Sequence, residues 1–233
     1  MKKTGHLFLQ NVPFTDHVKS DLYIPPKKGM WQLRLSKAFG HEPQVVRWYE
    51  RNLRADDVVF DVGAHMGYFG TLVSKLQPSV QFHGFEANWF IAHYLKLNQG
   101  INDPGSKWHI TEKFVGSRDS REWIAIDTYM QTHAAPTIFQ MDVDGEEINV
   151  LSGAKKLLDA ATSIFLVEVH PKDLKERNQS EAEFVALFNT DKYELRFLPD
   201  LRNENSEWSD NISAQHRTEE YYLLAAPKGK MRL

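Results

Sequence analysis

The chain has 233 residues, of which 42% are hydrophobic and 25% charged, and its formal net charge is −3. This length supports one large α/β domain with its own core, and a charge balance without a basic block argues against a nucleic-acid-binding surface. The sequence contains no cysteine, which excludes disulfides, thiolate metal sites and a cysteine nucleophile and is typical of the reducing cytoplasm, where we expect the protein.

The first forty residues carry the weakest pattern of the chain. Their apolar stretch is too short for a signal peptide, and no run in the sequence is long enough for a membrane span. A turn signal stands at Pro25 to Gly29. We therefore expect an N-terminal extension over residues 1–40, which would serve as a lid, arm or cap, and a single domain over residues 41–233.

From Pro43 onward, apolar periodicity predicts alternating helices and strands. The predicted strands cover residues 58–62, 81–86, part of 109–115, 137–141, 163–169, 193–198 and 221–225. The predicted helices cover residues 43–53, the segment ending near 78, the segment after Asn88, 127–132, 146–158 and 181–188. The last two strands have no convincing helix between them and should pair antiparallel. The predicted fold is α/β, a Rossmann-like and mostly parallel seven-stranded sheet with an antiparallel terminal strand pair and helices on both faces.

The segment from Val58 to Leu76 reads as a strand, a glycine turn and a helix, a unit that brings a ligand against bare backbone. A dinucleotide-binding turn has the pattern G-x-G-x-x-G, but His65 stands where its second glycine belongs. An acid two residues before the first glycine, here Asp61, is more typical of S-adenosylmethionine (SAM) sites. Asp61 should lie near the methionyl group, although the glycines could also merely form a tight turn. The residues expected to shape the methionine and ribose pocket are Gly63, Ala64 and Gly67.

A second acid, Glu86, ends the next predicted strand 19 residues after Gly67. At this spacing the second strand of a nucleotide-binding sheet offers a carboxylate to the ribose hydroxyls. Ala87 and Asn88 follow it directly and should also contact the cofactor. Adenine recognition is expected at the end of the third strand, from Gly116 to Asp119, with Ser117 and Asp119 as the contacting residues.

The acceptor side of the site is predicted at the ends of the fourth and fifth strands. Asp142 and Asp144 are two residues apart and point the same way on an extended chain, and Glu168 and His170 alternate similarly. We interpret His170 as a general base oriented by Asp142, both catalytic. Asp144 could instead only cap a helix. The four side chains would suit a divalent metal ion, but no tight metal-spacing motif is present, so no metal is expected.

The strings FDVGAHMGYF, FHGFEAN, MDVDGEEINVLSGA and FLVEVHP, in this order, resemble the motifs of the FkbM family of SAM-dependent methyltransferases. The resemblance covers about residues 38–171, and the sequence GHEP before the first helix resembles a further family element, which places Glu42 near the methionyl group. The resemblance implies a seven-stranded methyltransferase domain that binds SAM and methylates a hydroxyl of a small molecule or sugar. The charge balance and the lack of a long apolar run predict neither nucleic acid nor membrane as partner.

The sequence departs from the family pattern mainly on the acceptor side. Gln140 replaces a lysine, Asp144 a glutamate and Glu146 an alanine, while Ala87 replaces a proline after the ribose acid. These departures keep open a SAM-binding module without catalysis. An NAD(P)-dependent oxidoreductase on the same kind of sheet is the other alternative. The acceptor itself cannot be named from the sequence.

Overall fold

A seven-stranded sheet forms the centre of the computed structural model, which describes residues 8–24, 42–103, 105–211 and 220–231. From one edge to the other, its strands are β10 (Tyr193–Leu198), β11 (Tyr221–Pro227), β9 (Ile164–Val169), β8 (Ile138–Met141), β3 (Val58–Val62), β4 (Gln81–Phe85) and β5 (Trp108–Thr111). β11 runs antiparallel to both β10 and β9, and the remaining neighbours pair parallel. The predicted sheet and its antiparallel terminal pair are confirmed.

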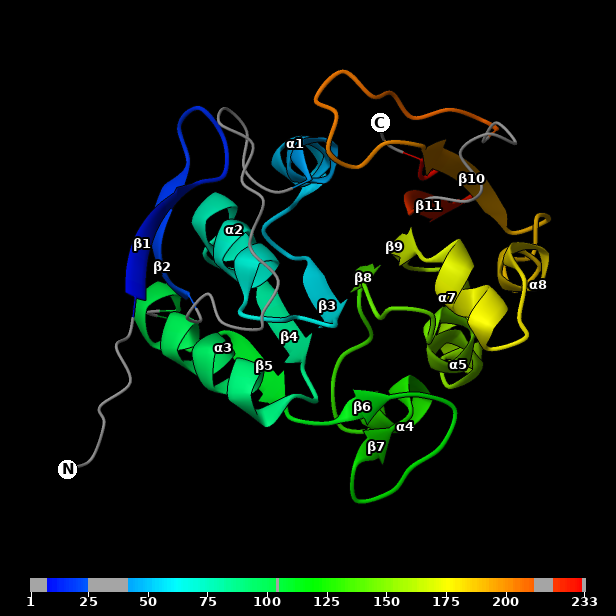
Figure 1. The fold of residues 1–233 in the computed structure, drawn as a ribbon, viewed down its shortest axis with the longest axis horizontal. Helices are drawn as coiled ribbons and strands as arrows, with labels where there is room; N and C mark the ends of the chain where they lie inside the picture. The colour runs from blue at the N-terminus through cyan, green and yellow to red at the C-terminus, as the bar shows by residue number, and fades with distance from the viewer. Residues whose placement is uncertain (1–7, 25–41, 104, 212–219, 232–233) are drawn as a thin grey trace.

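Helices cover both faces of this sheet (Figure 1). One layer holds α1 (Pro43–Asn52), α2 (Tyr68–Leu76) and α3 (Trp89–Asn102). The other holds α4 (Ile126–Tyr129), α5 (Glu147–Ser152), α6 (Lys155–Ala160), α7 (Pro171–Glu176) and α8 (Glu181–Val185). Because side chains alternate across a strand, neighbouring residues of β3 serve different cores: Val59 packs with the first layer and Phe60 with the second.

One local prediction is wrong, and the structure adds elements that the sequence did not predict. The single helix predicted over residues 146–158 is wrong: α5 and α6 are separate, and a Cβ at Gly153 between them would lie 2.0 Å from the carbonyl oxygen of Gly116. The close approach of these two backbones therefore requires a turn with glycine. α7 was not predicted. The third strand ends at Thr111, and the residues after it form a separate parallel ladder of β6 (Phe114–Val115) and β7 (Trp123–Ile124).

The described part of the N-terminal extension is an antiparallel hairpin of β1 (Phe8–Pro13) and β2 (Lys19–Ile24), for which the sequence predicted no element. Val12, Phe14 and Leu22 bury their side chains in the first core. The turn signal at residues 25–29 lies outside the described residues. Among the residues that the structure describes, no helix combines the length and apolarity that crossing a membrane requires.

Asn98 of α3, which is fully buried, joins the hairpin to the glycine turn after β3. Its side-chain amide donates to the carbonyl oxygens of Met66 at 2.8 Å and Tyr23 at 3.1 Å. Its carbonyl oxygen accepts from the backbone N–H of Tyr23 at 2.6 Å. One side chain of α3 thus satisfies backbone groups of two other segments, β2 and the glycine turn.

Candidate active site

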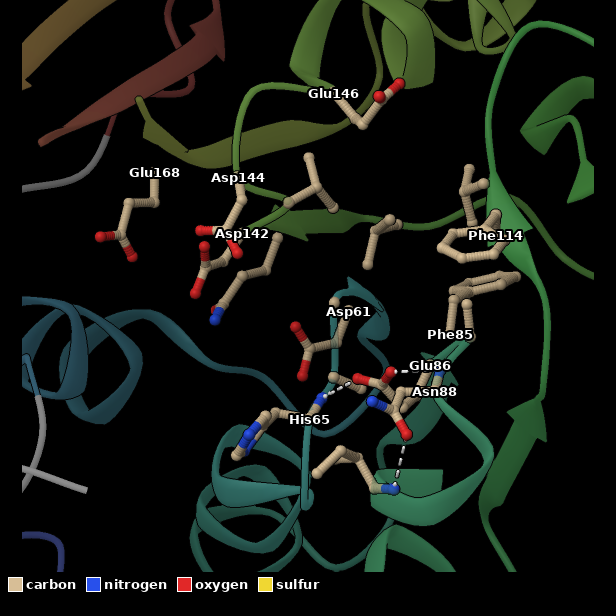
Figure 2. A pocket seen from close by; sticks show the side chains of 18 of the residues that line it. Asp61, His65, Phe85, Glu86, Asn88, Phe114, Asp142, Asp144, Glu146 and Glu168 are labelled. Atoms are coloured by element: carbon tan, nitrogen blue, oxygen red, sulfur yellow. Dashed lines mark hydrogen bonds between the residues drawn. The ribbon is translucent and has the colours of Figure 1, made fainter. Parts of the chain in front are cut away.

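A cavity of about 880 Å³ opens at the edge where the parallel strands β3, β4, β8 and β9 end. This edge includes the place where the chain order reverses between β3 and β8, the usual ligand position in such sheets. Figure 2 shows Glu168, Asp142 and Asp144 gathered at one end and Phe85 with Phe114 at the other. The predicted site residues that line it are Glu42, Asp61, Gly63, Ala64, Glu86, Ala87, Asn88, Asp142 and His170.

The glycine turn is built by close backbone contacts. Gly63 has a φ of 85°, and a Cβ there would lie 1.9 Å from the carbonyl oxygen of Asp142. The backbone N–H groups of Gly63 and Ala64 both donate to the carbonyl oxygen of Phe85, each at 3.0 Å. Gly67 also has a φ of 85°, but it is absent from the cavity lining. A Cβ on Gly67 would lie 2.7 Å from a methyl carbon of Leu95, so this glycine shapes the turn from behind.

Glu86 holds the two loops that border the cavity. Its carboxylate accepts the backbone N–H of His65 at 3.0 Å and that of Asn88 at 2.7 Å (Figure 2). Burial raises the pKa of Glu86, and these two hydrogen bonds oppose the rise only in part. Since each carboxylate oxygen has two lone pairs, both oxygens can still accept from a ligand. Asn88 caps α3 by accepting from the backbone N–H groups of Phe90 and Ile91.

The end of the cavity beside β3 is crowded with carboxylates. Asp61 is 3% exposed, and no donor among the described residues gives it a hydrogen bond. Burial raises its pKa well above the ordinary value, and the charges of Asp142, Glu42 and Glu86 raise it further. Glu42 accepts from the hydroxyl of Tyr222 at 2.7 Å. A positively charged ligand group would relieve this repulsion.

Gln140, which stands where the FkbM motif that the sequence resembles has a lysine, is tied into the core. Gln140 is 1% exposed, and its carbonyl oxygen accepts from the hydroxyl of Tyr49 at 2.7 Å. Gln140 still lines the cavity, as do Asp61 and Asp142. The substitution therefore removes a positive charge from the acidic end while keeping a polar side chain there.

His170 is fixed by a carboxylate that sequence reasoning missed. Its Nδ1 lies 2.8 Å from an oxygen of Glu147, and its backbone N–H donates to the same oxygen at 3.0 Å. Glu147 is completely buried, whereas the sequence showed it only as part of an acidic helix start. The orienting carboxylate is thus Glu147 rather than the predicted Asp142. The sequence offered no signal for this contact, because α5 must fold back against the end of β9 to make it.

The other ring nitrogen of His170 faces the acids of the cavity. Its Nε2 lies 3.5 Å from oxygens of both Asp142 and Asp144 and 3.8 Å from an oxygen of Glu168. Burial lowers the pKa of His170, but the hydrogen bond to Glu147 and the charges of the surrounding acids outweigh burial and raise the pKa to about 9. Both ring nitrogens therefore carry a proton at neutral pH in this arrangement, and the charged ring cannot accept another. This argues against the predicted role of His170 as a base.

The two residues predicted to recognise adenine do not line the cavity. Asp119 accepts from the backbone N–H of Ala125 at 2.9 Å and from the hydroxyl of Thr128 at 2.7 Å, so it holds the loop before α4. The backbone N–H of Ser117 donates to the side chain of Asn149.

An aromatic pair occupies this end of the cavity instead. Phe114 and Trp123 both line it, and their rings stack with centroids 4.9 Å apart at an angle of 27°. Phe114 remains 50% exposed, which leaves ring surface for a ligand. The pairing of β6 with β7 brings the two rings together, and no short motif in the sequence indicates it.

Comparison with solved structures identifies the fold. The FkbM methyltransferase of Methylobacillus flagellatus matches 74% of this chain and 45% of its own, with a TM-score of 0.55 and 14% identity. An rRNA methylase of Streptococcus thermophilus matches 78% of this chain and 92% of its own, with a TM-score of 0.51 and 9% identity. A candidate methyltransferase of Streptococcus mutans, solved with S-adenosylhomocysteine (SAH), matches 78% and 94%, with a TM-score of 0.51 and 10% identity.

The chain therefore has the Rossmann-like fold of the SAM-dependent methyltransferases, as predicted. The likeness to an FkbM structure agrees with the resemblance of the sequence motifs, although this chain spans less than half the length of that protein. No family model and no curated protein matches the sequence.

Proposed function

We propose that this protein binds SAM and transfers its methyl group to an acceptor. The observation that carries the proposal is one cavity in which Asp61, which has no hydrogen-bond donor among the described residues, and Glu86 flank the glycine turn. SAM carries an ammonium and a sulfonium, and the crowded carboxylates favour such charges. A dinucleotide instead carries a pyrophosphate, which the same carboxylates would repel.

The cofactor is proposed to lie across the strand ends from the acidic end to the aromatic end. Glu86 would accept the ribose hydroxyls, and Asp61 with Glu42 would hold the methionyl ammonium. Phe114 and Trp123 would take the adenine in place of Ser117 and Asp119. The cofactor half of the cavity is completed by Gly63, Ala64, Ala87 and Asn88. SAH binding by the structural neighbour from Streptococcus mutans supports this proposal.

The acceptor is proposed to be a hydroxyl of a small molecule or sugar, placed beside Asp142 and His170. Its oxygen would bond to the methyl carbon while the carbon–sulfur bond breaks and its electron pair stays on sulfur. The hydroxyl proton must leave, and Asp142 is the better recipient because the His170 ring already holds a proton. Holding the two reactants in line supplies much of the rate in such reactions. Acidic groups at this end disfavour a nucleic-acid acceptor, although rRNA is named for one structural neighbour.

Isothermal titration calorimetry with SAM, SAH, NAD and NADP tests the cofactor. We expect binding of SAM and SAH alone, whereas binding of NAD without an SAH signal would support the oxidoreductase alternative. Mass spectrometry of sugars, hydroxylated small molecules and RNA incubated with SAM then tests the acceptor. SAH binding without methyl transfer to any of these classes would support the non-catalytic alternative.

A further inference from the structure

Three side chains of different type meet where β8 and β9 end. Asp142, Glu168 and His170 each offer one ligand atom, and these atoms all lie within 4.8 Å of one another. The two strands are parallel neighbours in the sheet, so the chain delivers both carboxylates and the imidazole to one point. Two carboxylates and one imidazole form a donor set suited to hard or borderline divalent cations.

The imidazole is held in the orientation that a metal ligand requires. A carboxylate can only accept hydrogen bonds, so the Nδ1 of His170 must be the donor to Glu147. The Nε2 is thereby directed at the carboxylates in front of it. Metal-bound histidines almost always donate their other ring N–H to such a carboxylate. Glu147 is completely buried, and its second oxygen has no hydrogen-bond partner among the described residues.

The burial of Glu168 is an independent indication of a bound cation. It is 4% exposed, and no donor among the residues that the structure describes gives its carboxylate a hydrogen bond. Its nearest charged contact is the Nε2 of His170, at 3.8 Å. Figure 2 shows its carboxylate reaching into the cavity beside those of Asp142 and Asp144. In the metal-free protein the protonated ring of His170 is the only ion-pair partner of this carboxylate among the described residues, and a divalent cation would replace the Nε2 proton between the carboxylates.

We propose that Asp142, Glu168 and His170 form a binding site for one divalent metal ion such as Mn²⁺, with Glu147 as the residue that positions the imidazole. The sequence did not favour a metal because its ligands come from separate strands and only the fold unites them. The metal site does not depend on the identity of the cofactor. If methyl transfer is the activity, a hydroxyl bound to this ion would lose its proton more easily to solvent, and Asp142 would act as a ligand of the ion rather than as the recipient of that proton.

Titration of MnCl₂ into the full chain, after EDTA treatment and dialysis, tests the site. Electron paramagnetic resonance distinguishes free from bound Mn²⁺, and we expect one saturable site per chain. Pulsed measurements on the bound ion should detect the nitrogen of one imidazole, and this signal should disappear in a folded His170→Asn variant. Absence of saturable binding at millimolar Mn²⁺, or a bound ion without a nitrogen signal, would overturn the proposal.

Matched variants distinguish specific coordination of the ion by these side chains from nonspecific attraction of a cation to the acidic cavity. Glu168→Gln should weaken Mn²⁺ binding by at least ~10-fold, and Glu147→Gln, which disturbs only the support of the ring, by ~10- to 100-fold. Glu220→Gln removes the same charge from the same cavity and should change the affinity less than about threefold, since its partner is Arg202. Equal losses in Glu220→Gln and Glu168→Gln would refute the site. SAH titrations of the same variants measure whether cofactor binding is kept or lost independently of metal binding.

Discussion

Replacing Glu86 by alanine tests the cofactor half of the site most directly. The carboxylate already accepts from His65 and Asn88, and the proposed ribose hydroxyls would add charge-assisted bonds. Hydrogen bonds to charged groups contribute about 1.5–3 kcal/mol, and each 1.4 kcal/mol is about tenfold in affinity. Glu86→Ala should therefore weaken SAH binding by ~10- to 100-fold, as measured by isothermal titration calorimetry. The fold should survive because both backbone donors lie at the cavity and can bind water.

Glu112 supplies the matched control for this experiment. It follows the end of β5 as Glu86 follows the end of β4, but it pairs with Lys96 and does not line the cavity. Glu112→Ala should leave SAH affinity within about twofold of the original protein, as expected for an exposed ion pair. A folded Glu86→Ala protein with unchanged SAH affinity would show that Glu86 only ties the loops together, and the proposed position of the ribose would have to be abandoned.

Three further substitutions probe other parts of the site and core. Asp61→Asn should raise the Tm of the ligand-free protein, because it removes a buried carboxylate whose pKa is raised by burial and by Asp142. The same change should weaken SAH binding at least ~10-fold. Calorimetry measures both quantities, and an unchanged SAH affinity would contradict the ammonium contact. Gly63→Ala, at a φ of 85° and 1.9 Å from a carbonyl oxygen, should cost about 2–5 kcal/mol of unfolding free energy in urea titrations, and a loss below ~1 kcal/mol would refute the close approach. Burial and the neighbouring His109 lower the pKa of His83 from 6.5 to about 3, so between these pH values the unfolded chain binds a proton that the folded protein does not. The free energy of unfolding should therefore fall as the pH drops from 6.5 towards 3. An equally steep fall in the His83→Gln variant would exclude His83 as its source.

The parts of the site that the sequence predicted are those fixed by short segments. Asp61, Gly63 and Glu86 each follow directly from a strand and its turn, so the alternation of strands and helices places them at one edge without further information. The antiparallel end of the sheet was predictable for a similar reason, because the sequence between the last two predicted strands has no convincing helical pattern that could indicate a parallel crossover.

The missed features depend on contacts between distant segments. Glu147 supports His170 only because α5 packs against the end of β9. Phe114 reaches Trp123 through a two-residue ladder that has no detectable periodicity. The hairpin at residues 8–24 is too short for a clear alternation of polar and apolar residues. Its apolar side chains are buried only because they pack against helices that are distant in the sequence.

The bonds of Asn98 give the N-terminal hairpin a thermodynamic link to the glycine turn. Opening the hairpin would break both hydrogen bonds between Asn98 and the backbone of Tyr23, and the same side chain also holds the carbonyl of Met66 in the glycine turn. Segments joined in this way open as one cooperative unit, with a shared free energy of local unfolding. Amide hydrogen exchange in β2 and in the turn before α2 should therefore slow together when a ligand occupies the cavity, although the described hairpin residues do not line it.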